Sequence, residues 1–152
     1  MAGRRSEAHS LVAAAEEAFL GAKATDRTRL FVCSIYEDLR PLKGVAGALD
    51  WRLKGFLSRF VLGGRITGAR NEFVYVPVRY REAMRHLLLV GLGSSTEEET
   101  GAKAAAGLLA QLARTVANLK FEAVSISRSS FPFLDEAQFK KALKGVEVEF
   151  TQ

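Results

Sequence analysis

The stretch Arg-His-Leu-Leu-Leu-Val-Gly-Leu-Gly, from Arg85 to Gly93, is the part of the chain that decides its fold. Its run from His86 to Val90 is apolar without alternation, which predicts a strand buried on both faces. Two glycines follow, and apolar residues at helical spacing then predict a long helix from about Glu97 to Leu119. A buried strand that turns directly into a helix is the building unit of α/β folds, so we expect such a fold here.

Helix and strand patterns alternate on both sides of this stretch. Apolar residues at helical spacing predict the helices, and short β-rich runs predict the strands. Asp135 and Gln138 have the spacing of a capping box and mark the start of the last helix. The alternation predicts a sheet with helices on both faces, in a single domain over residues 1–152 that opens with a helical segment in 1–25. The expected helices are residues 6–22, 44–62, 97–119 and from 135 onward, and the expected strands are 30–36, 73–78, 86–90, 123–127 and 146–150.

The composition is that of a globular protein, with 48% hydrophobic and 26% charged residues among 152. The longest uncharged run, residues 86–96, is shorter than the ~18 apolar residues that cross a membrane. A single cysteine, Cys33, cannot form an internal disulfide, which suits a reducing compartment. One cysteine and two histidines, His9 and His86, cannot supply a structural zinc site. We therefore expect a cytoplasmic protein without a membrane segment and without a metal site.

Positive charge is concentrated in one part of the chain. Residues 51–85 contain eight lysines and arginines and two glutamates, a balance of +6 (eight minus two), whereas the whole chain carries +5. Such a segment attracts nucleic acid if its arginines share one face. The other interpretation is a solvated helix face beside a charged hairpin, with no aromatic residues interleaved as in a stacking platform. The candidate nucleic-acid contacts are Arg52, Arg59, Arg65, Arg79 and Arg81.

The sequence contains no residue pattern typical of a catalytic centre. Cys33 lies among apolar residues, which predicts a buried, unreactive thiol. Neither histidine has a Ser, Cys or second His at a recognisable spacing. The turn from Gly91 to Thr96 can present N–H groups to a phosphate, but Glu97–Glu99 in the following helical turn repel an anion. We therefore expect no catalytic residue and no cofactor.

A second glycine pair lies at the predicted start of the 44–62 helix. Gly44 and Gly47 can let the backbone approach a ligand closely at a helix N-terminus. Alternatively, they let the helix pack tightly on the sheet. The candidate ligand-binding residues are Gly44, Val45, Ala46 and Gly47.

The order of these segments resembles the N-terminal domain of the leucyl (cytosol) aminopeptidase family. The resemblance rests on Leu87-Leu-Leu-Val-Gly-Leu-Gly93, on Ala48-Leu-Asp50 within a helix, and on Phe73-Val-Tyr-Val-Pro77. It covers roughly residues 30–127 and implies a three-layer α/β/α sandwich with a mixed sheet, similar to a macro domain. In that family the catalytic lysines and the acidic metal ligands lie in a second domain, whose Asn-Thr-Asp-Ala-Glu-Gly-Arg motif does not occur in these residues. The resemblance therefore carries over no catalytic or metal-binding residue.

The macro-domain resemblance bears on the glycine pair. Gly44-Val-Ala-Gly-Ala-Leu49 is similar to the loop with which ADP-ribose-binding macro domains hold a diphosphate. The Asn-Ala-Ala-Asn type segment before that loop is replaced by residues 37–43, where Glu37 and Asp38 disfavour a pyrophosphate and Lys43 partly offsets them.

We expect a non-catalytic, stand-alone relative of the aminopeptidase N-terminal domain that acts by binding or assembly, with a protein partner or a second copy. One alternative is binding of ADP-ribose or a related nucleotide at Gly44–Gly47. The other is non-specific binding of nucleic acid through the basic segment 51–85.

Overall fold

The computed structural model describes residues 13–17, 19–20, 29–96 and 102–151, which contain one five-stranded mixed sheet. β2 (Phe73–Tyr80) and β3 (Ala83–Gly91) form an antiparallel hairpin at one edge. β1 (Arg29–Ile35) lies in parallel between β3 and β4 (Ala123–Ser127), and β5 (Glu147–Thr151) completes the order β2-β3-β1-β4-β5. The central strands are largely apolar because both of their faces are covered.

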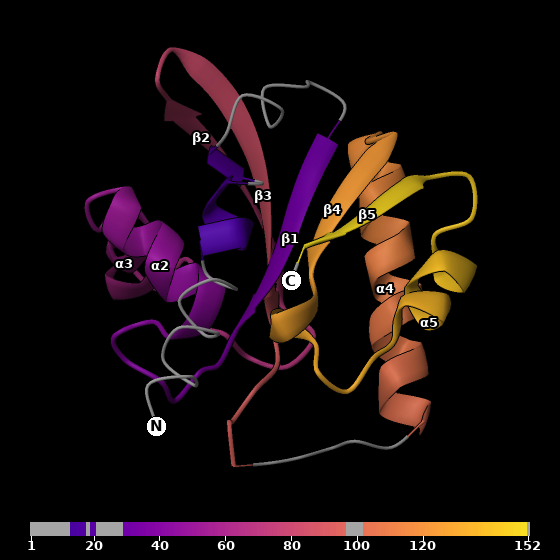
Figure 1. The fold of residues 1–152 in the computed structure, drawn as a ribbon. Helices are drawn as coiled ribbons and strands as arrows, with labels where there is room; N and C mark the ends of the chain where they lie inside the picture. The colour runs from indigo at the N-terminus through magenta and orange to yellow at the C-terminus, as the bar shows by residue number, and fades with distance from the viewer. Residues whose placement is uncertain (1–12, 18, 21–28, 97–101, 152) are drawn as a thin grey trace, which may run out of the picture.

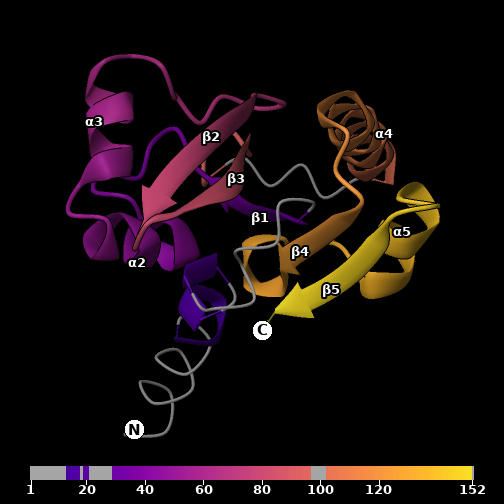
Figure 2. The ribbon, with the colours of Figure 1, turned by 90° about the horizontal axis from the view of Figure 1, so that it is seen from above.

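Helices cover both faces of the sheet, as Figures 1 and 2 show. α2 (Gly44–Arg52) and α3 (Phe56–Leu62) lie on one face, and α4 (Ala102–Leu119) and α5 (Glu136–Ala142) lie on the other. After β4 the chain makes one short 3-10 turn, η2 (Arg128–Ser130). The expected three-layer α/β/α sandwich with a mixed sheet is confirmed.

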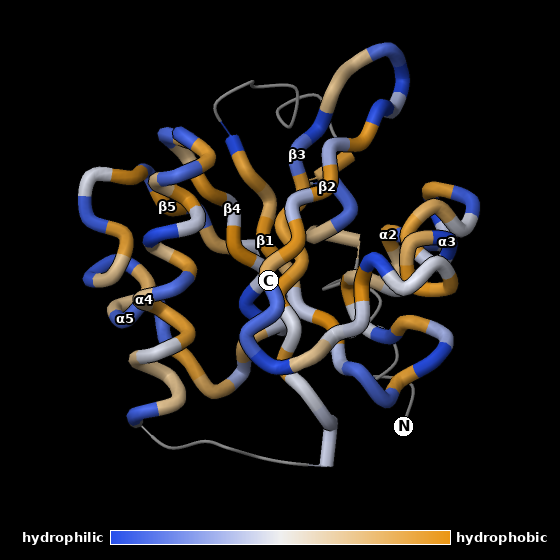
Figure 3. The backbone as a smooth tube through the Cα atoms, turned by 180° about the vertical axis from the view of Figure 1, so that it is seen from behind, coloured by the Kyte–Doolittle hydropathy of each residue, from blue (hydrophilic) through white to orange (hydrophobic). Residues whose placement is uncertain are grey.

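Successive residues of β1 point to opposite faces of the sheet and fill two separate cores. Phe31 and Cys33 pack beneath α2 and α3, whereas Leu30 and Val32 pack beneath α4 and α5. Burial raises the pKa of the Cys33 thiol to about 12, so the thiol is protonated at neutral pH and unreactive, as its apolar neighbours predict. Figure 3 shows the apolar residues along the central strands and the hydrophilic residues at the β2–β3 turn.

The single helix expected over residues 44–62 is wrong, because the chain forms two helices there. α2 ends at Arg52, and Lys54 and Gly55 then take left-handed backbone angles, with φ of 56° and 79°, before α3 begins. The buried Asp50 carboxylate caps the new helix: it accepts a 2.9 Å hydrogen bond from Ser58 N in the first turn of α3 and a second one from Ser58 Oγ. The apolar spacing continues across the break, so periodicity alone does not reveal it.

The last helix begins as its sequence predicts. Asp135 accepts a 2.8 Å hydrogen bond from Gln138 N, and Gln138 Oε1 accepts one of 2.9 Å from Asp135 N. The expected capping box is confirmed.

The other expected elements are present wherever the structure describes the chain, with ends shifted by a few residues. β2 is an edge strand of the described sheet, which agrees with Pro77 inside it. Residues 13–17 and 19–20 are helical, while the rest of the 6–22 helix and the first turn of the 97–119 helix lie outside the described residues. In the part of the chain that is described, no helix is both long and apolar enough to span a bilayer.

Candidate functional site

The carboxyl ends of three parallel strands meet at one edge of the sheet. β1 ends at Ile35, β3 at Gly91 and β4 at Ser127, and the loops that follow lead to the helices. This edge is where open α/β sheets bind ligands. Two cavities lie here, of about 240 and 480 Å³, and Tyr36 lines both of them.

The smaller cavity combines hydroxyl groups with the start of α2. Ser34 Oγ donates a 2.7 Å hydrogen bond to the carbonyl oxygen of Ser130, which ties the end of β1 to the turn after β4. Ser130 Oγ in turn lies 3.1 Å from Ser127 Oγ and donates to it. No carboxylate occurs among the described residues around this cavity, which are Ser34, Ile35, Tyr36, Leu39, Leu42, Lys43, Gly44, Val45, Ser129 and Ser130.

The four residues predicted to bind a ligand, Gly44 to Gly47, lie in two different environments. Gly44 and Val45 line the smaller cavity, and a Cβ on Gly44, whose φ is 62°, would meet no atom within 4 Å. Ala46 is fully buried in the core, and a Cβ on Gly47 would lie 2.2 Å from the carbonyl oxygen of Leu42. Gly47 therefore packs against the loop before α2 and not against the sheet, whereas Gly44 lies at the cavity.

The N-terminus of α2 presents a positive end to the smaller cavity. Lys43 is the N-cap residue, no side chain caps the helix there, and its first turn has no acidic residue. The first N–H groups of a helix have no acceptor within the helix, and the helix dipole adds to their positive character. Together with the Lys43 ammonium group, this arrangement favours an anion.

The two carboxylates expected to oppose an anion line neither cavity. Asp38 accepts hydrogen bonds from Ser95 N at 2.9 Å and from Ser95 Oγ at 2.7 Å, which ties the loop after β1 to the loop after β3. These bonds lower the pKa of Asp38 below its ordinary value. Glu37 is exposed, and its backbone N–H donates to the carbonyl oxygen of Gly93 at 2.9 Å. Neither carboxylate therefore lies in the described wall of a cavity, although Asp38 stays ionised.

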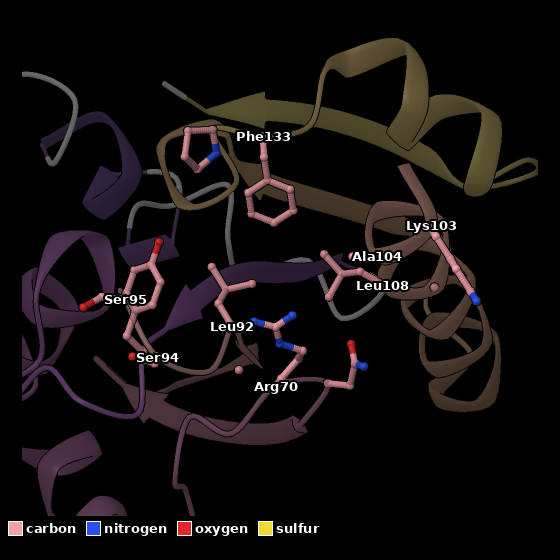
Figure 4. Close-up of a pocket in the computed structure, with 13 residues that line it drawn as sticks. Arg70, Leu92, Ser94, Ser95, Lys103, Ala104, Leu108 and Phe133 are labelled. Carbon is pink, nitrogen blue, oxygen red and sulfur yellow. The ribbon is translucent and has the colours of Figure 1, made fainter. Parts of the chain in front are cut away.

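The larger cavity lies between the loop after β3 and the first described turns of α4 (Figure 4). Next to this cavity, the end of β3 and the loop after it pack closely on the chain before β2. Gly93 N donates a 2.9 Å hydrogen bond to the carbonyl oxygen of Gly68, and a Cβ on the lining residue Gly91 would lie 2.0 Å from the carbonyl oxygen of Ala69. The glycines considered above as a phosphate loop thus bring β3 against the 67–71 turn. The lining residues are Tyr36, Arg70, Asn71, Gly91, Leu92, Ser94, Ser95, Lys103, Ala104, Gly107, Leu108, Pro132 and Phe133.

The five predicted nucleic-acid arginines are all exposed but belong to different elements. Arg52 ends α2 and forms a 2.9 Å ion pair with Glu16. Glu16 raises the pKa of Arg52, and Tyr80 adds to this shift. The others lie in α3 (Arg59), after α3 (Arg65), in β2 (Arg79) and in the β2–β3 turn (Arg81).

Arginines and aromatic rings contact one another across this region. The guanidinium groups of Arg59, Arg65 and Arg81 lie over the rings of Phe56, Phe60 and Tyr80, at 5.9, 5.8 and 5.3 Å from the ring centres. Each pair joins residues that are one to five positions apart in the chain, so the aromatic residues do interleave with the arginines in the sequence. The expectation that no aromatic residues interleave with them is wrong.

Sequence reasoning missed the side chains of the larger cavity, above all Arg70 and Phe133. These residues come from the turn before β2 and from the loop after η2, which are far apart in the chain. The sequence did contain a signal for the position of this cavity, because the carboxyl ends of parallel strands lie at a common edge of the sheet, where their loops converge. Which loop residues point inward depends on backbone contacts that one sequence does not show.

The described residues contain no group of side chains that could bind a metal ion. Across 13–17, 19–20, 29–96 and 102–151, no three His, Cys, Asp or Glu side chains gather to hold a metal ion.

Comparisons with known proteins agree with this architecture. The family model for the cytosol aminopeptidase family, N-terminal domain, matches residues 32–147. No curated protein matches the chain. A mutant of tomato leucine aminopeptidase has a similar structure, with a TM-score of 0.52 and 16% identity over 80% of this chain and 28% of that chain. The chain therefore spans little more than a quarter of the tomato enzyme.

Two macrodomains share the fold. The macrodomain of Mycobacterium tuberculosis DarG has a TM-score of 0.58 and 14% identity, covering 87% of this chain and 91% of that chain. The macrodomain of Thermus aquaticus DarG has a TM-score of 0.54 and 13% identity, covering 81% and 88%. At such identities the likeness concerns the fold alone. The family match, in contrast, covers most of the chain, and the chain belongs to the cytosol aminopeptidase family through that family's N-terminal domain.

Proposed function

We propose that this domain acts by binding rather than by catalysis, and that the smaller cavity takes a phosphate-bearing nucleotide such as ADP-ribose. The observation that carries the proposal is the composition of that cavity. The N-terminus of α2, the Lys43 side chain and several serine hydroxyls border it, without a carboxylate among the described lining residues.

Each of these groups suits a diphosphate. Backbone N–H groups at a helix N-terminus donate to phosphate oxygens, and a lysine ammonium group adds a charge-assisted hydrogen bond. Gly44 leaves space for the close approach, because a Cβ there would point into open space. The resemblance of residues 44–49 to a diphosphate loop supports the same ligand class.

Titration calorimetry with ADP-ribose tests this proposal. Saturable binding is expected, and Lys43→Glu is expected to weaken it roughly ten- to hundredfold, because a hydrogen bond to a charged group contributes about 1.5–3 kcal/mol. Lys144→Glu makes the same charge change at an exposed position outside both cavities and should keep the wild-type affinity. A flat titration of the wild-type protein with both ADP-ribose and inorganic pyrophosphate would remove the proposal.

Gly47 is not a suitable position for this test. A side chain there would collide with the backbone of Leu42, so a loss of binding would report damage to α2 rather than contact with a ligand.

The contacts between arginines and aromatic rings favour a second candidate function, non-specific binding of nucleic acid through segment 51–85. Arginine stacked on an aromatic ring keeps N–H donors for phosphate while the ring limits its freedom. The exposed side chain of Trp51, with 78% of its surface accessible, adds an aromatic group to the same segment.

For this second candidate, binding to duplex DNA is expected to weaken steeply with salt, with each phosphate contact contributing about −0.9 to the log–log slope. The double variant Arg79→Glu/Arg81→Glu should bind more weakly with a shallower slope. The matched double variant Lys141→Glu/Lys144→Glu, at exposed positions in and after α5, should not change the slope. Gel shifts over a salt series measure this, and equal slopes for both double variants would argue against a contact through these arginines.

A further inference from the structure

We propose that the outer surface of α2 and α3 binds the surface of an anionic lipid bilayer, with two apolar side chains in the bilayer interface and three cations on the lipid headgroups. This inference goes beyond both candidate functions, because the partner is a lipid surface and not a nucleotide or a nucleic acid. Contact with a bilayer surface requires no spanning helix. The α2–α3 surface consists of Trp51, Lys54, Arg59, Leu62 and Arg65, all of them exposed.

Two large apolar side chains of this surface are almost fully accessible. Trp51, near the end of α2, has 78% of its surface exposed, and Leu62, the last residue of α3, has 87% exposed. A side chain that lines a groove is partly covered by the walls of the groove, so these two residues suit a partner without a fixed shape. Tryptophan is typical of the membrane–water interface, where leucine often accompanies it on the apolar face of peripheral segments.

The fold holds both apolar side chains in one outer layer. α2 and α3 lie side by side on the same face of the sheet (Figures 1 and 2), and the Asp50 carboxylate joins them through its hydrogen bonds from Ser58. Trp51 directly follows Asp50, and Leu62 follows Ser58 by four residues, which places it on the same side of α3. Trp51 and Leu62 therefore flank the contact that joins the two helices.

The charge of this surface is complementary to anionic lipid. Residues 51–65 contain four lysines and arginines and no carboxylate. Arg52 is engaged by Glu16 at 2.9 Å, whereas Lys54, Arg59 and Arg65 form no ion pair within the part of the chain that the structure describes. Each exposed cation near an anionic bilayer adds attraction, and long cationic side chains reach the headgroups while apolar neighbours go deeper.

The two arginines remain suited to headgroup phosphates although they contact aromatic rings. Arg59 lies over Phe56 and Arg65 over Phe60, and the two half-buried rings contact each other edge to face at 5.1 Å. A guanidinium over a ring keeps its N–H donors in the plane of the group, where phosphate oxygens can accept from them. Figure 3 shows hydrophobic and hydrophilic residues next to one another in α2 and α3.

The exposed leucine favours a bilayer over nucleic acid at this surface. Contacts to a phosphate backbone depend on cations, and stacking on bases depends on aromatic rings, so both leave Leu62 without a role. At a bilayer interface its side chain is removed from water, which is favourable in proportion to the apolar area.

The fluorescence of Trp51 tests the proposal directly, because Trp51 is the only tryptophan of the chain. Vesicles of phosphatidylcholine mixed with phosphatidylglycerol are expected to shift its emission to shorter wavelength and to protect it from quenching by acrylamide. Vesicles of phosphatidylcholine alone should bind at least about tenfold more weakly, because they offer the three cations no negative charge. Added salt should weaken binding to the mixed vesicles.

Three outcomes overturn the proposal. The first is an unchanged emission with the mixed vesicles. The second is equal binding to both kinds of vesicle, which would remove the role of charge. The third is a change with duplex DNA that the mixed vesicles do not reproduce, which would assign the surface to nucleic acid.

A substitution of the exposed leucine tests the place. Leu62→Asp is expected to weaken partition into the mixed vesicles at least about tenfold, because it replaces an inserted apolar group with a charge. Met84→Asp makes a similar change in β3, at a side chain that is 47% exposed and lies outside the α2–α3 surface, and should keep the wild-type partition. Both variants retain Trp51 as the reporter.

Charge reversal tests the cations. Arg59→Glu/Arg65→Glu should weaken partition roughly 25-fold or more, since each cation near an anionic bilayer contributes about fivefold. Lys141→Glu/Lys144→Glu makes the same change of net charge in and after α5 and should have a much smaller effect. Thermal melting checks that each variant is folded. Equal partition of Leu62→Asp and Met84→Asp contradicts the assignment even if the arginine variant fails to fold.

Discussion

Replacing Gly91 with alanine is expected to lower the free energy of unfolding by about 3 kcal/mol, the upper part of the range for overpacked positions. The added Cβ would lie 2.0 Å from the carbonyl oxygen of Ala69 and 2.8 Å from the carbonyl carbon of Gly68. Both are backbone atoms, and the turn that contains them is tied to β3 by hydrogen bonds from Gly91 N to Glu72 O (2.7 Å) and from Asn71 N to Gly91 O (3.1 Å). The turn therefore cannot move away without breaking these bonds.

Thermal melting measures this effect, with an expected decrease in Tm of roughly 6–12 °C for a chain of this size. Gly107→Ala is the matched control, since it adds the same methyl group where no atom lies within 4 Å. That control should raise stability by about 1 kcal/mol, because alanine is the better helix former within α4. Equal melting temperatures for the two variants would show that the backbone of Gly68 and Ala69 leaves room for a Cβ on Gly91.

Removing the Asp50 carboxylate, as in Asp50→Ala, is expected to cost about 2 kcal/mol of stability. Asp50 is buried, and its carboxylate accepts hydrogen bonds from both Ser58 N and Ser58 Oγ. Without it, the first turn of α3 loses its cap, and Ser58 keeps two partly buried donors without this acceptor. α3 has only seven residues, so it depends on such external contacts to remain helical.

Chemical denaturation of three variants measures this effect. Asp50→Asn keeps one acceptor oxygen and should lose less stability than Asp50→Ala. Asp135→Ala removes the exposed cap of α5 and should cost about 1 kcal/mol, the ordinary value for a helix cap. If Asp50→Ala is no more destabilising than Asp135→Ala, the contact with Ser58 is not a buried cap.

Local patterns were sufficient to predict most of the fold. The apolar run from His86 to Val90 and the alternation of helices and strands predicted a sheet covered on both faces, and the spacing of Asp135 and Gln138 predicted the start of α5. These features depend on interactions between residues a few positions apart, so the sequence contains both partners of each interaction within one short segment.

The break between α2 and α3 was not predictable in the same way. Apolar residues at helical spacing continue through it, Gly55 is compatible with several backbone conformations, and nothing in the sequence marks Lys54 for the left-handed conformation that it adopts. The break is stabilised by Asp50, which caps the next helix only after the chain has turned.

In the candidate site, too, some features were predictable from the sequence and others were decided by the fold. The sequence indicated that Gly44 and Gly47 lie at a helix start, yet only the fold distinguishes Gly44 at a cavity from Gly47 against Leu42. Gly91 and Gly107 are likewise indistinguishable as residues, although one contacts a backbone oxygen and the other borders open space. Periodicity and capping act along the chain, whereas the space around a side chain is set by segments that approach it from elsewhere in the sequence.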